Sequence, residues 1–122
     1  MEYHLQQYGH PSEYGYKDLC NDWIIDKWNP DELMELYIEM GARYFVAMGN
    51  HHDNFDCWDS EYQPWNSVNV GPKKDIVGIW KEVADRYDMP FGIGFHATPA
   101  RTYGQFMTVR YRSDRTGPYE GV

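Results

Sequence analysis

The sequence predicts an α/β fold in which parallel strands are joined by crossover helices. Two observations carry this prediction: short strand-like segments alternate with longer amphipathic helices, and the strand-like segments are apolar almost throughout. Alternation of strands and helices is typical of βαβ units. Strands without a polar face are buried on both sides, as strands of parallel sheets usually are.

A first helix is predicted from Pro30 to Met40. Asn29 is a favourable N-cap, proline suits the first helical turn, and acidic residues follow where the helix dipole is positive. Apolar residues then recur at helical spacing and form one stripe, namely Leu33, Leu36, Tyr37 and Met40. We expect Gly41 to end the helix in a left-handed conformation.

One strand–helix–strand unit is predicted after this helix. Segments 43–48 and 91–96 are short, apolar and rich in β-prone residues. Between them, Asp75 can cap a second helix, whose apolar face comprises Ile76, Ile79, Trp80, Val83, Ala84 and Tyr87. A helix between two strands allows a right-handed crossover, so we expect the strands to be parallel neighbours.

The remaining segments are predicted to be irregular. Residues 1–28 are aromatic and polar, and within them only 22–28 is a candidate for a regular element. Residues 97–122 form a polar C-terminal tail without another clear core element. The stretch from Gly49 to Lys74 is predicted to be a long loop, and long loops inside compact domains are usually functional.

Two parallel strands cannot cover both of their own faces, so the predicted unit belongs to a larger sheet. A (β/α)8 TIM-like barrel has eight such strands and about 250 residues, whereas this chain has 122 residues. We therefore predict that residues 1–122 form a single, partial barrel domain. The alternative is a small complete α/β domain in which the aromatic N-terminal region supplies further strands.

Composition argues against several classes of protein. Eleven basic and 19 acidic side chains give a net charge of −8, which disfavours nucleic acid or an anionic membrane as partner. No apolar stretch approaches the length of a membrane span, and no export signal is visible at the N-terminus. Cys20 and Cys57 have no metal-binding spacing; we interpret them as thiols, with a disulfide left open. Neither compartment nor oligomeric state follows from the sequence.

Three histidines follow the ends of the two predicted strands. His51 and His52 come after the first strand and His96 ends the second, so parallel pairing would bring all three to one edge. Imidazoles can donate to and accept from neighbouring sugar hydroxyls, and Trp65 in the long loop offers an aromatic face. A sugar site is therefore one interpretation of this group, with His51, His52, His96 and Trp65 as candidate residues.

Other interpretations of these residues stay open. Histidines together with Asp53 or Asp56 are the residue types of a zinc or iron site. Adjacent histidines on an extended segment point to opposite sides, however, unless a bulge re-aims them. Acid–base chemistry by a pair of loop carboxylates is a third option, although acidic loop residues usually form turns. The histidines and Trp65 could also be purely structural, as a polar strand boundary and a loop core.

Longer motifs surround the candidate residues. They comprise Gly-Ala-Arg-Tyr-Phe-Val at 41–46, Asn-His-His-Asp-Asn-Phe-Asp at 50–56, the segment 65–78, and Phe-Gly-Ile at 91–93. Together they resemble glycoside hydrolase family 29, the α-L-fucosidases. The resemblance implies an irregular (β/α)-barrel that hydrolyses terminal α-L-fucose of glycoconjugates with retention and without a metal or other cofactor. It also implies that His51 and His52 contact hydroxyls of the fucose.

The sequence departs from the family pattern in its motifs, including Gly94-Phe95-His96 where a tyrosine is common, and in its length. Asn50 stands where a lysine is more usual, and Asn54 stands where a glycine is commoner. In the family, the nucleophile and the acid/base follow later strands, and no segment after His96 resembles either region. We therefore expect the chain to contact a fucosylated glycan but to lack the catalytic carboxylates. The alternatives are a metal-dependent barrel hydrolase and a non-catalytic carbohydrate-binding module.

Overall fold

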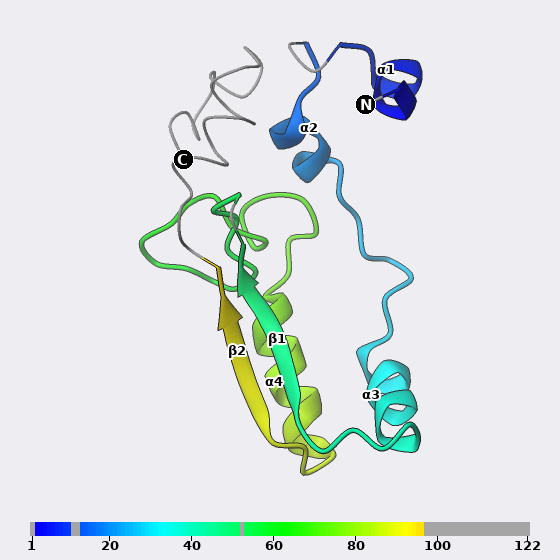
Figure 1. Cartoon of the computed structure of the whole chain (residues 1–122). Coiled ribbons are helices and arrows are strands. Elements are labelled where there is room, and N and C mark those ends of the chain that lie inside the picture. The colour runs from blue at the N-terminus through cyan, green and yellow to red at the C-terminus, as the bar shows by residue number, and fades with distance from the viewer. Residues whose placement is uncertain (1, 11–12, 52, 97–122) are drawn as a thin grey trace.

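The computed structural model describes residues 2–10, 13–51 and 53–96. In chain order its elements are α1 (Glu2–Tyr8), α2 (Tyr16–Asn21), α3 (Pro30–Glu39), β1 (Phe45–Asn50), α4 (Ile76–Arg86) and β2 (Phe91–Phe95). β1 and β2 pair in parallel, and α3 lies near the ends at which these strands begin (Figure 1). The predicted strand–helix–strand unit is confirmed; the sheet in the described part of the chain has two strands.

α3 begins and ends where its sequence signals predict. The side chain of Asn29 accepts a hydrogen bond from the N–H of Glu32 at 3.3 Å, and Pro30 occupies the first turn. Gly41 follows the helix with a φ of +90°, the left-handed conformation expected for it. The local signals therefore set both ends of this helix to within one residue.

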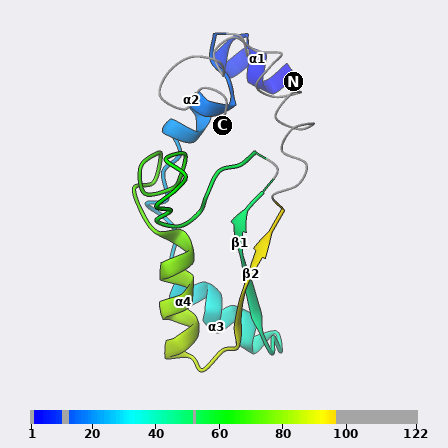
Figure 2. The ribbon, with the colours of Figure 1, turned by 90° about the vertical axis from the view of Figure 1, so that its left-hand side faces the viewer.

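α4 is the crossover helix that makes the strand pair parallel. Asp75 accepts a hydrogen bond from the N–H of Gly78 at 2.7 Å and so caps the helix as predicted. Figure 2 shows α4 running alongside the strand pair. One core cluster joins the two helices and the turn before β2, and its buried members are Met34, Val83, Ala84 and Met89. Burial of this cluster holds α3 and α4 together. Met34, outside the predicted stripe, is the buried residue of α3, whereas Leu36 and Met40 of the stripe are exposed.

The pairing of β1 with β2 is regular at first and ends in a bulge. Phe45 pairs with Phe91 and Met48 with Gly94, but the next pair joins Asn50 to Phe95, so Gly49 is the extra residue. A Cβ atom on Gly49 would lie 2.7 Å from Cγ2 of Ile93, so the close approach requires a glycine. The bulge interrupts the strand alternation immediately before His51.

The N-terminal segment corrects the sequence prediction. The described part of 1–28 is not irregular throughout, because α1 and α2 lie there, and no helix or strand occupies 22–28. These helices have only seven and six residues, too few for a clear apolar period. α2 is stabilised instead by tertiary contact, since Cys20 packs in a cluster with Phe55, Trp65 and Val70.

Two further predictions concern the C-terminal tail and membrane-spanning segments. The predicted irregular tail at 97–122 lies outside the described residues. Among the helices that the structure describes, none has the length and apolar character required to cross a bilayer.

Met34 provides a test of the core between α3 and α4. Its side chain is fully buried, whereas Met40 at the end of the same helix is 78% exposed. We expect Met34→Ala to lower the free energy of unfolding by about 2–5 kcal/mol, because it removes buried contacts and leaves a cavity. Met40→Ala, the matched control, should change it by less than about 0.5 kcal/mol. Urea denaturation followed by tryptophan fluorescence measures both, and equal effects would contradict this core.

Candidate functional site

The carboxyl ends of β1 and β2 meet at one edge of the sheet, beside the loop 51–75 (Figure 1). His51 follows β1, and His96 follows β2. The centroids of their imidazole rings lie 5.0 Å apart, with the ring planes inclined by 38°. The backbone N–H of His96 donates to the carbonyl oxygen of Asn50 at 2.9 Å, which extends the strand pairing. The prediction that parallel strands bring His51 and His96 together is confirmed.

The other two predicted site residues are placed differently. His52 lies outside the described residues. Trp65 is only 1% exposed, and its ring packs edge-on against Phe55 with centroids 5.1 Å apart. The ammonium group of Lys17 lies 5.8 Å from the centroid of the same ring. Trp65 is thus a core residue of the loop in this structure and presents no open face for stacking on a sugar.

Two buried polar residues, Asn50 before the histidines and Asp56 after them, form a pair. Asn50 and Asp56 are 4% and 5% exposed, and the amide nitrogen of Asn50 donates to Oδ1 of Asp56 at 2.6 Å. The N–H of Cys57 donates to the carbonyl of Gly49 at 2.8 Å. These bonds fasten the loop to the end of β1. The pair has no periodic signal in the sequence, because its two polar residues lie on either side of a turn.

α2 holds a second carboxylate of the loop. The hydroxyl of Tyr16 donates to Oδ2 of Asp53, and Oδ1 of Asp53 accepts from the N–H of Phe55 at 3.1 Å. Burial, together with this hydrogen bond, raises the pKa of Tyr16 far above its ordinary value. The phenol therefore remains a hydrogen-bond donor at neutral pH. Tyr16 was not among the predicted site residues, because its partner lies far along the chain.

The loop 51–75 has a core of its own. Its apolar residues Phe55, Trp65 and Val70 pack with Cys20 of α2. Asn66 is fully buried, and its amide nitrogen donates to the carbonyl of Gln63 at 2.8 Å. Its Oδ1 accepts from the backbone N–H groups of Val68 and Asn69 at 3.0 and 2.9 Å. Internal bonds of this kind satisfy buried backbone groups, so the loop is a stable support for the histidine edge.

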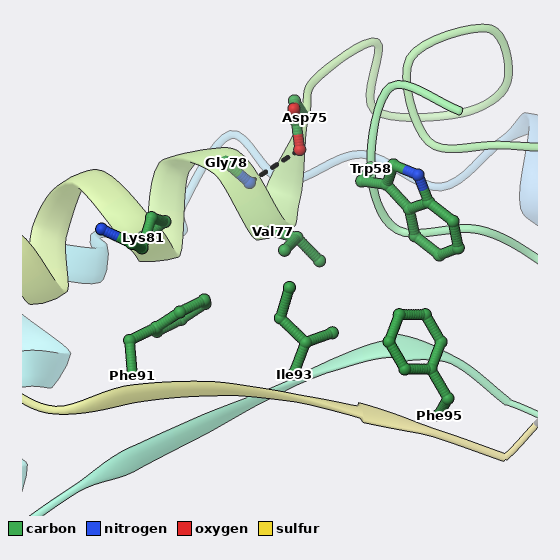
Figure 3. A pocket seen from close by; sticks show the side chains of 8 residues that line it. All are labelled: Trp58, Asp75, Val77, Gly78, Lys81, Phe91, Ile93 and Phe95. Atoms are coloured by element: carbon green, nitrogen blue, oxygen red, sulfur yellow. Dashed lines mark hydrogen bonds between the residues drawn. The ribbon is translucent and has the colours of Figure 1, made fainter. Parts of the chain in front are cut away.

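An apolar groove lies between α4 and β2 (Figure 3). Its volume is about 470 Å³, and its apolar lining comprises Trp58, Val77, Phe91, Ile93 and Phe95. Trp58 meets Phe95 edge to face, with ring centroids 5.5 Å apart. The carboxylate of Asp75, at the rim, is already used to cap α4. The groove offers few groups for the hydroxyls of a sugar, so it is distinct in character from the histidine edge.

The described residues contain no metal-binding cluster. Nowhere in 2–10, 13–51 and 53–96 do three or more His, Cys, Asp or Glu side chains gather as metal ligands would. Zinc and iron sites usually have three or four protein ligands. Recognition of hydroxyls needs fewer groups, because each imidazole offers two nitrogen atoms.

Comparison with known proteins decides the family. The family model described as alpha-L-fucosidase matches residues 1–119. The chain belongs to the alpha-L-fucosidase family. A putative alpha-L-fucosidase of Caenorhabditis elegans is 37% identical over 81 residues, and the human plasma alpha-L-fucosidase is 31% identical over 86 residues. These matches cover 66% and 69% of this chain but only 17% and 18% of the two relatives.

Solved structures of fucosidases share the local fold of this family member. The alpha-fucosidase of Thermotoga maritima, in complex with a mechanism-based inhibitor, matches with a TM-score of 0.72 and 33% identity. That match covers 77% of this chain and 22% of the Thermotoga chain. Alpha-L-fucosidase AlfC from Lactobacillus casei, with a TM-score of 0.64 and 23% identity, shares the fold. The chain thus spans about a fifth of the length of the Thermotoga enzyme and the curated relatives.

The buried Asn50–Asp56 pair gives a prediction about the site's support. Asp56→Ala should lower the free energy of unfolding by about 1–3 kcal/mol, because it leaves the buried amide of Asn50 without an acceptor. Asp59→Ala is the control, since Asp59 is an exposed carboxylate of the same loop. Urea denaturation of both variants is the measurement. Equal stability of the two variants would show that the pair contributes nothing.

Cys57 gives a prediction about pH. Burial raises the pKa of its thiol to about 11, and the charges of Asp53 and Asp56 act in the same direction. We expect iodoacetamide to alkylate Cys57 much more slowly than free cysteine at pH 8, with a rate that rises toward pH 11. Stability should fall over the same interval, because the unfolded chain loses this proton first. Mass spectrometry of the Cys57 peptide measures the rate, and a plateau near pH 9 would contradict the raised pKa.

Proposed function

We propose that this fucosidase-family chain binds the terminal α-L-fucose of a glycan at the edge formed by His51, His52 and His96. One observation carries the proposal: the imidazoles of His51 and His96 lie 5.0 Å apart at the carboxyl ends of two parallel strands in a chain of this family. In parallel α/β folds, ligands bind at this edge of the sheet.

The chemistry of paired imidazoles suits the edge of a sugar ring. A neutral imidazole has one donor and one acceptor nitrogen, and each sugar hydroxyl both donates and accepts. Two neighbouring rings can therefore bind adjacent hydroxyls. His52 joins the proposed site through the motif resemblance, in which paired histidines contact the fucose. Trp65 is not part of the proposal, because its ring is covered by Phe55.

We propose a (β/α)8 barrel as the complete fold, of which residues 1–122 supply one partial domain. The parallel strand pair and its crossover helix are one repeat of such a barrel. Large apolar side chains on the strands are half-exposed, with exposed fractions of 45–55%: Val46, Met48, Ile93 and Phe95. Further strand–helix units packed on these residues and in the α4–β2 groove would bury them.

The complete protein is proposed to be a retaining α-L-fucosidase. Its nucleophile and its acid/base are proposed to lie outside residues 2–10, 13–51 and 53–96, which the structure describes. Retaining hydrolysis needs two carboxyl groups about 5 Å apart across the scissile bond. Asp53 is bound to Tyr16 and to the Phe55 backbone, and Asp56 is bound to Asn50. These bonds give both loop carboxylates structural roles, so neither is assigned a catalytic one.

The purified chain is expected to bind L-fucose, and His51→Ala should weaken binding at least tenfold. The variant removes the imidazole that is proposed to contact the sugar hydroxyls, and a tenfold loss corresponds to about 1.4 kcal/mol. His10→Ala, in the exposed N-terminal segment, is the matched control and should leave the affinity unchanged. Isothermal calorimetry measures the affinity, with D-fucose as the mirror-image sugar that should not bind. No binding of L-fucose by the unmodified chain would refute the proposal.

The same preparation tests the assignment of the carboxylates. We expect no hydrolysis of an aryl α-L-fucoside by the 122-residue chain. Turnover that His52→Ala abolishes would mean that this chain contains the nucleophile and the acid/base after all. Stoichiometric zinc or iron in the purified protein would instead favour the metal-dependent hydrolase. If the complete protein binds fucose but does not hydrolyse the aryl α-L-fucoside, the non-catalytic carbohydrate-binding module is favoured.

A further inference from the structure

We infer that Tyr16 is a positioning residue for the fucose site: its hydroxyl holds Asp53, and Asp53 holds the turn that begins at His51. The inference rests on the proposed function, because the site that is positioned is the proposed sugar-binding edge. Tyr16 itself is assigned no contact with the sugar.

A chain of three hydrogen bonds connects Tyr16 to the turn. The Tyr16 hydroxyl donates to Oδ2 of Asp53, and the N–H of Phe55 donates to Oδ1 of the same carboxylate at 3.1 Å. The N–H of Asn54 donates to the carbonyl oxygen of His51 at 3.0 Å and closes the turn. Both carboxylate oxygens are therefore used, one by the turn's own backbone and one by α2. The position of the turn relative to α2 depends on the Tyr16 bond.

The turn requires this external support. Asn54 has a φ of +60°, a left-handed conformation that asparagine adopts more readily than most residues but less readily than glycine. The preceding strand is already interrupted by the bulge at Gly49. Pairing resumes with Asn50 opposite Phe95, and the bond from the His96 N–H to the Asn50 carbonyl is its last one, so the register pairs of β1 stop before His51. A tertiary anchor at Asp53 supplies the missing restraint.

α2 is a suitable anchor because it is firmly packed on the loop. Cys20 of α2 belongs to the same buried cluster as Phe55 and Trp65, and Tyr16 packs against that cluster. A Cβ atom on Gly71 would lie 2.3 Å from the carbonyl oxygen of Cys20, so loop and helix backbones are in close contact. Figures 1 and 2 show α2 beyond the carboxyl ends of the strands, on the side of the loop.

The Tyr16 hydroxyl keeps its proton at neutral pH. Burial and the Asp53 hydrogen bond raise the pKa of Tyr16, so its proton is retained in neutral and mildly alkaline solution. The hydroxyl is therefore available to donate to Asp53 under these conditions.

Two tyrosine variants separate positioning from a general structural role. Tyr16→Phe removes the hydroxyl bound to Asp53, and Tyr14→Phe removes the neighbouring hydroxyl, which is bound to Asp22 outside the loop. We expect Tyr16→Phe to weaken L-fucose binding about fivefold or more, and Tyr14→Phe to change it less than twofold. Far-ultraviolet circular dichroism should be the same for both variants and for the unmodified chain.

A spectroscopic measurement tests the inference without any sugar. The rings of His51 and His96 are close enough for contacts between their protons to be seen by NMR. We expect Tyr16→Phe to shift the His51 ring signals and weaken this contact, whereas Tyr14→Phe should retain both. The spectrum of His51→Gln assigns the signals. If the unmodified chain binds no fucose, the proposed function fails, and this measurement still decides the role of Tyr16.

Three results would overturn the inference. The first is unchanged fucose affinity and unchanged His51 signals in Tyr16→Phe. The second is weaker fucose binding by Tyr16→Phe while the NMR contact between His51 and His96 is intact. The loss of affinity would then not result from a displaced His51. If Tyr16→Phe does not fold, Asp53→Ala replaces it, because this variant keeps the Tyr16 ring in the core and removes both acceptor oxygens. Unchanged His51 signals in Asp53→Ala are the third.

Discussion

Parallel pairing of β1 with β2 is the constraint on which the candidate site depends. The eleven residues of α4 carry the chain back about 16 Å, close to the length of a five-residue strand. β2 therefore starts beside the beginning of β1, with Phe91 opposite Phe45. Both carboxyl ends then meet at one edge, and His51 and His96 come within ring contact. An antiparallel pair would place them at opposite ends of the sheet.

A second layer, built from the loop 51–75 and α2, supports this edge. Asn66 makes four hydrogen bonds within this layer, and Asp56 joins the layer to β1 by accepting from the Asn50 amide nitrogen. Acidic residues close to histidines suggest acid–base chemistry when only their sequence is considered. Here Asp53 and Asp56 shape the backbone instead, because their oxygens accept hydrogen bonds from Tyr16, Phe55 and Asn50.

Apolar side chains of the strand pair are exposed, which agrees with the small share of the fucosidase relatives' length that this chain covers. Side chains such as Met48 and Phe95 are about half-exposed, although apolar residues of parallel strands are normally covered on both faces. The relatives are several times longer than the segment that this chain matches. The apolar groove lined by Trp58 and Ile93 is a further apolar surface that no described element covers.

The sequence by itself determined the elements whose signals are local. Asn29, Gly41 and Asp75 set helix ends because a cap acts on backbone groups within a few residues. The strands and their parallel direction followed from apolar runs separated by a helix, and so did the meeting of His51 with His96. Only the tertiary structure decided that 1–28 contains two helices, that Trp65 is buried, and that Tyr16 binds Asp53. Those features depend on contacts between residues far apart in the chain. The sequence of any single local segment contains no signal that predicts such contacts.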